Sequence, residues 1–212
     1  MKKSRTVFHI CTAIVLILLL ILGGILLILH AAPWGFAREV SVEEEQLRLD
    51  VVNTAQQWLG SSENNNTHLP ILEIYNQHQP LARGYAVQSN DDWCSVFVST
   101  VAIQCGLTEY IPTECGCEPQ IELFKQIDCW VEDDAYLPLP GDVIFYHWDC
   151  DAENDCTHWS DHVGIVTGTI GSYIRVIEGN YHNRVSYRII KADDPQIRGY
   201  GTADYAAASS QY

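Results

Sequence analysis

Hydrophobic positions divide the chain into one long apolar run and a series of shorter periodic segments. Residues 7–29 are almost wholly apolar. Apolar or small residues then recur at positions 94, 97, 98, 101, 102 and 105, the spacing of one face of a helix. Residues 163–168 and 173–179 are rich in strand-forming side chains. The pattern predicts a membrane-length segment followed by a mixed helical and stranded part.

Predicted helices precede predicted strands in the part of the chain after residue 40. The expected elements are, in order, a helix opened by the capping box Ser41-Val42-Glu43-Glu44 and ending near Leu59, a short helix over 69–76, a helix over 94–105, a connector with a possible helix over 106–137, and strands from Pro138-Leu139-Pro140-Gly141 to residue 203. This order predicts an α+β domain in which the helix over 94–105 packs on an antiparallel β-sheet.

The apolar run at 7–29 exceeds the roughly 20 residues that cross a bilayer. Lys2, Lys3 and Arg5 precede it and the cluster Glu43-Glu44-Glu45 follows it, so the positive-inside rule places the amino terminus in the cytoplasm. We therefore expect a single-pass cell-membrane protein with an extracellular domain. A signal peptide cleaved near His30-Ala31-Ala32 is the alternative, because small residues follow the run. The expected organisation is a cytoplasmic tail at 1–6, an anchor at 7–29, a linker at 30–40, a catalytic domain at 41–205 and a tail at 206–212.

Cys94 stands at the start of the helix expected over 94–105. Only the thiolate form of a cysteine attacks a carbonyl carbon well, and a free thiol is mostly protonated near neutral pH. The positive end of a helix dipole and a neighbouring imidazolium both favour the thiolate. The sequence therefore predicts that Cys94 is a nucleophile with a histidine beside it.

The two predicted strands supply partners for that thiol. Thr169-Ile170-Gly171 between them suits a three-residue hairpin loop with glycine at its left-handed position. Pairing the strands about Ile170 sets His162 opposite Glu178, close enough for the carboxylate to hold the imidazole ring. His162 is thus the expected base, Glu178 the expected orienting acid, and Asn180 lies on the same face.

Several sequence blocks together resemble one enzyme family. They are Trp93-Cys94 ahead of a helix, Pro140-Gly141-Asp142-Val143-Ile144-Phe145-Tyr146, Asp161-His162-Val163-Gly164-Ile165-Val166, Val176-Ile177-Glu178-Gly179-Asn180 and Ile197-Arg198-Gly199-Tyr200. Over about residues 45–205 the chain resembles the CHAP amidohydrolases and peptidases, relatives of the NlpC-like and papain-like enzymes. The resemblance implies a papain-like fold, with Cys94 as nucleophile, His162 as general base and then acid, Glu178 orienting the histidine and Asn180 as an accessory polar group.

The resemblance also implies a function, hydrolysis of an amide bond in peptidoglycan. Asp91, Asp92 and Trp93 are expected to line the cleft. Two alternatives remain: a non-catalytic module that binds the cell wall or serves as a scaffold, and a cysteine protease that acts on protein. No cofactor is expected.

The net charge of the chain limits the kinds of partner that it can bind. After residue 30 the chain carries all 27 acidic residues and nine Lys and Arg, a net charge of −18. Such a surface repels polyanions, so no nucleic-acid partner is expected.

Eight cysteines are present, of which Cys11 falls in the apolar run and Cys94 is expected to stay free. The remaining six form an even set that would be oxidised in pairs in an extracellular domain. Cys150 and Cys156 flank a short acidic loop and could close it. Cys115 and Cys117 are expected to pair with Cys105 and Cys129.

The acidic loop itself offers oxygen ligands at alternate positions, as a calcium loop does. These are Asp149, Asp151, Glu153 and Asp155. The loop lacks the glycine at the sixth position and the distant bidentate glutamate of a calcium loop. A calcium site and an exposed acidic turn both remain open, and no other metal is expected.

Overall fold

The structure is a computed structural model that describes residues 12, 14–21, 24, 34–150 and 159–210. The chain divides into two compact units, Met1–Pro33 and Trp34–Tyr212. The predicted calcium ligands Asp151, Glu153 and Asp155 lie outside the described residues, as does Cys156.

The first unit corrects the predicted membrane anchor. Its described helical residues are 12, 14–21 and 24. Among the residues that the structure describes, no helix has the length and apolar character needed to cross a bilayer. The prediction of a single-pass membrane protein anchored through 7–29 is therefore wrong. The cell-membrane localisation that was based on this anchor is wrong as well.

The second unit is built on an antiparallel sheet. Within 34–150 and 159–210 the sheet has six strands in the order β1-β6-β2-β3-β4-β5. The strands are β1 (Trp130–Val131), β2 (Val143–Tyr146), β3 (His162–Ile170), β4 (Tyr173–Glu178), β5 (Ser186–Lys191) and β6 (Ile197–Gly201). The central strand β3 is buried along nearly its whole length.

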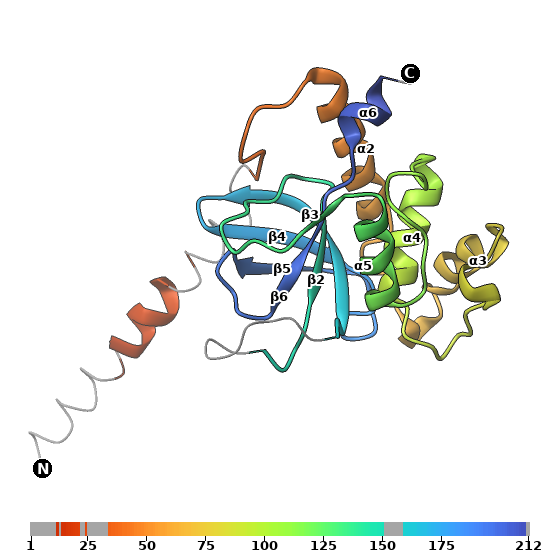
Figure 1. Ribbon diagram of the computed structural model, residues 1–212. Helices are drawn as coiled ribbons and strands as arrows, with labels where there is room; N and C mark the ends of the chain where they lie inside the picture. The colour runs from red at the N-terminus through yellow and green to blue at the C-terminus, as the bar shows by residue number, and fades with distance from the viewer. Residues whose placement is uncertain (1–11, 13, 22–23, 25–33, 151–158, 211–212) are drawn as a thin grey trace, which may run out of the picture. The chain divides into compact units, whose positions relative to one another are not determined.

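The helices of this unit gather beside the sheet (Figure 1). They are α2 (Val42–Gln57), α3 (Leu69–Gln77), α4 (Cys94–Cys105), α5 (Cys117–Gln126) and α6 (Tyr205–Ser209), with short 3₁₀ turns at Glu63–Asn65 and Ala82–Gly84. The predicted α+β class, with helices before strands and an antiparallel sheet, is confirmed.

Helix α4 contacts α2, α3 and α5 as well as strand β3 of the sheet. Trp93 is its N-cap residue, and Gly106, with φ 68°, ends it in the left-handed conformation that glycine adopts without cost. The first nine residues, Cys94 to Ala102, are all buried. The spacing of apolar positions predicted one buried face, but the helix is covered on every side there because α2, α3 and the sheet surround it.

Alternating strand residues fill two cores on opposite faces of the sheet. Val143 and Phe145 of β2 belong to the core shared with the helices, whereas Ile144 and Tyr146 belong to the core on the other face. Both faces of the sheet are therefore packed against a hydrophobic core.

The pairing of β3 with β4 differs from the predicted register. Ile170 pairs with Tyr173 across a two-residue turn, not a three-residue loop, and an irregularity follows between Val166 and Gly168. Ile165 then pairs with Ile177, so the next position along places Gly164 opposite Glu178. The prediction that His162 stands directly opposite Glu178 is wrong by two positions, because a hairpin loop and a bulge each change the register.

The Pro140-Gly141-Asp142 block anchors α2 to the sheet. Asp142 is fully buried, and its Oδ1 accepts a hydrogen bond of 2.8 Å from Arg48 Nη1. Its Oδ2 accepts from the Tyr136 hydroxyl at 2.7 Å and from the Leu139 amide at 2.8 Å. We call Asp142 and Arg48, with these partners, the anchor cluster.

The cysteines differ from the predicted pairing. Cys105, Cys115, Cys117 and Cys129 are free thiols, as is Cys94. Cys105 Sγ donates to Thr54 Oγ1 at 3.4 Å, and Cys115 Sγ accepts from Arg83 Nη2 at 3.1 Å. The prediction of disulfides among these four is wrong. Cys150 is disulfide-bonded.

Candidate active site

Cys94 is the first residue of α4, and its side chain is buried, with 6% of the residue exposed. The first amides of a helix have no partner within it, and the macrodipole places positive charge at this end. Cys117, the first residue of α5, points its sulfur at Cys94, with Sγ atoms 3.5 Å apart. Two helix amino termini thus converge on the candidate nucleophile.

His162 begins β3 and lies beside Cys94. Its Nε2 is 3.8 Å from Glu178 Oε2, which is too long for a hydrogen bond, so the carboxylate acts on the ring through charge. Glu178 is completely buried and is held instead by Arg188, whose Nε donates to Oε1 at 3.0 Å. We call His162, Glu178 and Arg188 the histidine cluster.

Gly164 is what lets Glu178 reach His162. A Cβ atom added at Gly164 would lie 2.7 Å from Glu178 Cγ, 2.7 Å from Val176 Cγ1 and 3.1 Å from the Ile177 carbonyl oxygen. No real Cβ atom tolerates the shorter contacts. The glycine therefore leaves a gap through which the Glu178 side chain runs along the sheet from its own strand position to the ring two residues away.

Cys94 and His162 shift each other's pKa in opposite directions. The hydrogen bond from Cys117 and the hydrogen bond and charge of His162 outweigh burial and lower the pKa of Cys94 to about 5. Burial works to lower the pKa of His162, but Cys94 and Glu178 outweigh it and raise that pKa to about 9. Between these values the charged pair, thiolate and imidazolium, is the favoured form.

Cys117 has the opposite behaviour, and sequence reasoning missed it. Its hydrogen bond to Cys94 and its burial raise the pKa of Cys117 well above the usual value, so it stays protonated and donates to the Cys94 sulfur. The only sequence signal was a cysteine at the start of a second amphipathic segment. That signal could not place Cys117 next to Cys94, which lies 23 residues earlier in the chain.

Asn180 lies just beyond β4 in the left-handed conformation, with φ 58°. Its side-chain amide donates to Asp92 Oδ1 at 3.1 Å, which links the end of β4 to the loop ahead of α4. Asn180 thus contacts the loop before the nucleophile, and its role as an accessory polar group stays a prediction.

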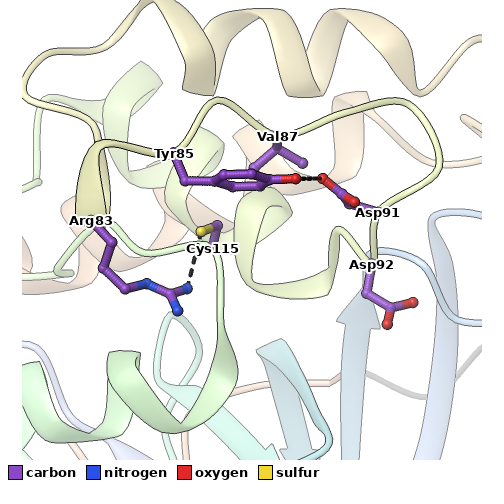
Figure 2. A pocket seen from close by; sticks show the side chains of 6 residues that line it. All are labelled: Arg83, Tyr85, Val87, Asp91, Asp92 and Cys115. Atoms are coloured by element: carbon purple, nitrogen blue, oxygen red, sulfur yellow. Dashed lines mark hydrogen bonds between the residues drawn. The ribbon is translucent and has the colours of Figure 1, made fainter.

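A pocket of about 460 Å³ opens beside that loop. Figure 2 shows its lining residues, with the Tyr85 hydroxyl directed at Asp91 and the Arg83 guanidinium at Cys115. Asp91 and Asp92 were both expected at the cleft, and both line this pocket. Trp93 does not, because it is fully buried and its Nε1 donates to Glu63 at 2.9 Å.

Aromatic rings pack against the histidine cluster. The Arg188 guanidinium lies over Tyr146, 4.1 Å from the ring centroid, and over Trp148 at 4.9 Å. The ring of Trp148 lies 5.2 Å from that of His162, and Tyr181 follows at 5.9 Å. These rings, which the sequence did not single out, limit the ring positions open to His162.

Metal ligands are a separate question. Among the described residues no group of three or more His, Cys, Asp or Glu is arranged to hold a metal ion.

Comparison with known proteins leaves the family open. No protein-family model matches this chain. No curated protein matches it. Among solved structures, it is similar to an NlpC/P60 family protein from Bacillus cereus, with 18% identity and a TM-score of 0.42, over 74% of this chain and 40% of that chain. Similarity at that level does not assign the chain to a family, so the resemblance to the CHAP enzymes stays a prediction.

Proposed function

We propose that this chain is a cysteine-dependent amidohydrolase or peptidase of the papain-like kind, and that it cleaves an amide bond in peptidoglycan. The observation that carries the proposal is the meeting of Cys94, at the amino terminus of a buried helix, with His162 and the buried carboxylate of Glu178. Perturbed titratable groups in one cluster are typical of active sites.

The proposed mechanism is acyl transfer. The Cys94 thiolate attacks the amide carbon and forms a thioester, while the C–N bond breaks and His162 gives its proton to the leaving amine. The Cys94 backbone amide, free at the helix start, donates to the developing oxyanion. Water then attacks the thioester, His162 takes the proton from it, and the acid product leaves with Cys94 restored as the thiolate.

The other residues of the site have supporting roles in this mechanism. Glu178 stabilises the charged form of His162, as the raised pKa of that histidine indicates. Asn180 holds Asp92 and so fixes the loop ahead of the nucleophile. The nearby pocket is lined by Arg83 as well as by Asp91 and Asp92, so it presents charges of both signs to a substrate.

Peptidoglycan is proposed as the substrate class because the Cys94, His162 and Glu178 sequence blocks resemble those of CHAP enzymes. The test is to digest purified bacterial cell wall with the full chain and to identify new amino and carboxyl termini by mass spectrometry. Cys94→Ser should release none, and Cys105→Ser, the same change at a thiol that contacts Thr54, should act like the unaltered chain.

A parallel digest of an unfolded protein separates the proposed substrate from the protease alternative. New termini in the cell wall but not in the protein support the proposal. Cleavage of the protein alone overturns the substrate class and leaves the thiol mechanism, whereas wall cleavage that persists in Cys94→Ser overturns the mechanism.

A further inference from the structure

The site contains a second buried thiol that forms no covalent bond in the proposed hydrolysis. Cys117 is buried, with 8% of the residue exposed, and its Sγ lies 3.5 Å from that of Cys94. Both sulfurs are at the first residue of a helix, α4 and α5. A disulfide bond is about 2.05 Å long, so the two sulfurs must approach by about 1.5 Å to form one.

Buried hydrogen bonds fix the two helix starts against each other. Ser95 Oγ donates to Gln120 Oε1 of α5 at 2.8 Å. One turn further along α4, Ser99 Oγ accepts from the Glu114 amide at 2.8 Å and donates to the Glu114 carbonyl at 2.7 Å. The contact between the sulfurs is therefore held by the fold and does not depend on an exposed loop.

Neighbouring cysteines are directed elsewhere. Cys115 is two residues from Cys117, but its sulfur accepts from Arg83 Nη2 and lines the pocket. Cys105, on the same helix as Cys94, donates to Thr54 on α2. Of the described cysteines, Cys117 is the one whose sulfur contacts the candidate nucleophile.

We propose that Cys94 and Cys117 are a redox modification site, at which a hydroperoxide converts the two thiols into a reversible disulfide. The disulfide would remove the nucleophile from use and shield it from irreversible oxidation. The modification rests on the geometry of the two sulfurs, and its effect on hydrolysis rests on the proposed function.

The reaction proceeds in two balanced steps, written here for hydrogen peroxide. The Cys94 thiolate attacks one peroxide oxygen; the S–O bond forms, the O–O bond breaks, and the leaving hydroxide takes the proton of the His162 imidazolium to become water, or an alkoxide becomes an alcohol where the oxidant is an organic hydroperoxide. Cys94 is thereby oxidised to a sulfenic acid. The Cys117 sulfur then attacks the Cys94 sulfur, the S–S bond forms as the S–O bond breaks, and the Cys117 proton leaves with the hydroxyl as a second water.

The first test maps the bond without reference to activity. The full chain is treated with hydrogen peroxide, its remaining thiols are alkylated, and it is digested with one protease that cuts after aromatic residues and one that cuts after Glu. Cuts at Trp93 and Phe97 separate Cys94 from Cys105, and cuts at Glu114 and Glu122 release Cys115 with Cys117. We expect a cross-link between these peptides that a thiol reductant removes.

Two variants identify the partner. The cross-link should persist in Cys115→Ser and disappear in Cys117→Ser. A wild-type chain without the cross-link, or a cross-link that survives in Cys117→Ser, overturns the proposal.

The second test follows hydrolysis of purified cell wall, with each variant compared with its own untreated sample. After treatment with peroxide and then with reductant, the wild-type chain should regain most of its activity. The fraction of activity that Cys117→Ser regains should be about tenfold smaller, because a sulfenic acid that forms no disulfide oxidises further to irreversible acids. Equal recovery in both overturns the shielding role. A cross-linked chain that hydrolyses no wall in its reduced form overturns the proposed function instead, and leaves the redox site standing.

Discussion

Two buried charged clusters lie in the same domain, and their hydrogen bonding differs. In the anchor cluster, both oxygens of Asp142 accept hydrogen bonds, from Arg48, Tyr136 and Leu139. In the histidine cluster, within the part of the chain that the structure describes, His162 Nε2 and Glu178 Oε2 are buried without a hydrogen-bond partner. One cluster is satisfied and the other is not.

The difference separates structural from chemical roles. A buried polar atom without a hydrogen-bond partner lowers the free energy of unfolding by about 1–3 kcal/mol. The unsatisfied atoms of the histidine cluster therefore make the domain less stable. Unsatisfied buried groups call for an explanation such as a catalytic role, whereas the fully hydrogen-bonded anchor cluster is explained by its hold on the fold. Substitutions in the anchor cluster should therefore lower stability, and substitutions at the site should lower activity.

The largest effect should follow loss of the nucleophile. Cys94→Ala removes the atom that forms the thioester, so hydrolysis of cell wall should fall by about 10³-fold or more while the melting temperature changes little. His162→Ala should be almost as severe. Cys105→Ala is the matched control. A large drop in melting temperature with Cys94→Ala would remove the distinction between the two clusters.

The anchor cluster should show the reverse behaviour. Asp142→Ala leaves the buried Arg48 with the Glu44 carboxylate at 2.7 Å and the Pro140 carbonyl at 3.1 Å, and breaking a buried ion pair costs about 3 kcal/mol or more. Denaturant unfolding measures this change, and Glu122→Ala at the exposed Glu122–Lys125 pair should cost less than about 1 kcal/mol. Normal stability in Asp142→Ala would show that the anchor is not what holds α2 to the sheet.

Gly164→Ala tests the gap that lets Glu178 reach His162. The added methyl would force Glu178 and Val176 aside and shift His162, two residues away on the same strand. A displacement of about 1 Å can cost up to about 10²-fold in activity, so we expect kcat/KM to fall about 10- to 100-fold. Gly35→Ala, where a Cβ meets nothing within 4 Å, is the control. An unchanged kcat/KM would mean that Glu178 need not reach the ring.

The smallest loss should follow Glu178→Gln, and it should depend on pH. In the unaltered chain, kcat/KM should rise as Cys94 loses its proton near its pKa of about 5 and fall as His162 loses its proton near its pKa of about 9. Removing the Glu178 charge lowers the pKa of His162, so the upper limb should move down by about one pH unit or more. An upper limb that stays in place would show that Glu178 does not act on His162 through charge.

The sequence predicted the elements better than it predicted their contacts. The helix at 94–105 came out with those bounds because its apolar spacing and the glycine after it are both local signals. The register of β3 with β4 could not be predicted, because the bulge beyond Val166 depends on how the whole sheet twists. Cys94, His162 and Glu178 lie together all the same, since the Glu178 side chain is long and Gly164 leaves it room.

The errors came from features with no local signal. Counting cysteines as an even set predicted disulfides, but pairing requires sulfurs that meet in space, and Cys105 and Cys115 face Thr54 and Arg83. The length of the apolar run at 7–29 predicted a span, and the described helical residues fall short of one. Cys117 was missed because only tertiary packing brings α5 to Cys94.

The proposed mechanism depends most on Cys94 being a thiolate at neutral pH. The rate at which Cys94 is alkylated tests this directly. The full chain is exposed to a small iodoacetamide dose across the pH range, and modification of Cys94 is compared with that of Cys105 in the same sample by mass spectrometry. Burial raises the pKa of Cys105, so its rate should climb only in alkaline solution. We expect the alkylation rate of Cys94 to reach its plateau just above the Cys94 pKa of about 5. A Cys94 rate that climbs together with that of Cys105 would contradict the thiolate–imidazolium pair, and with it the proposed mechanism.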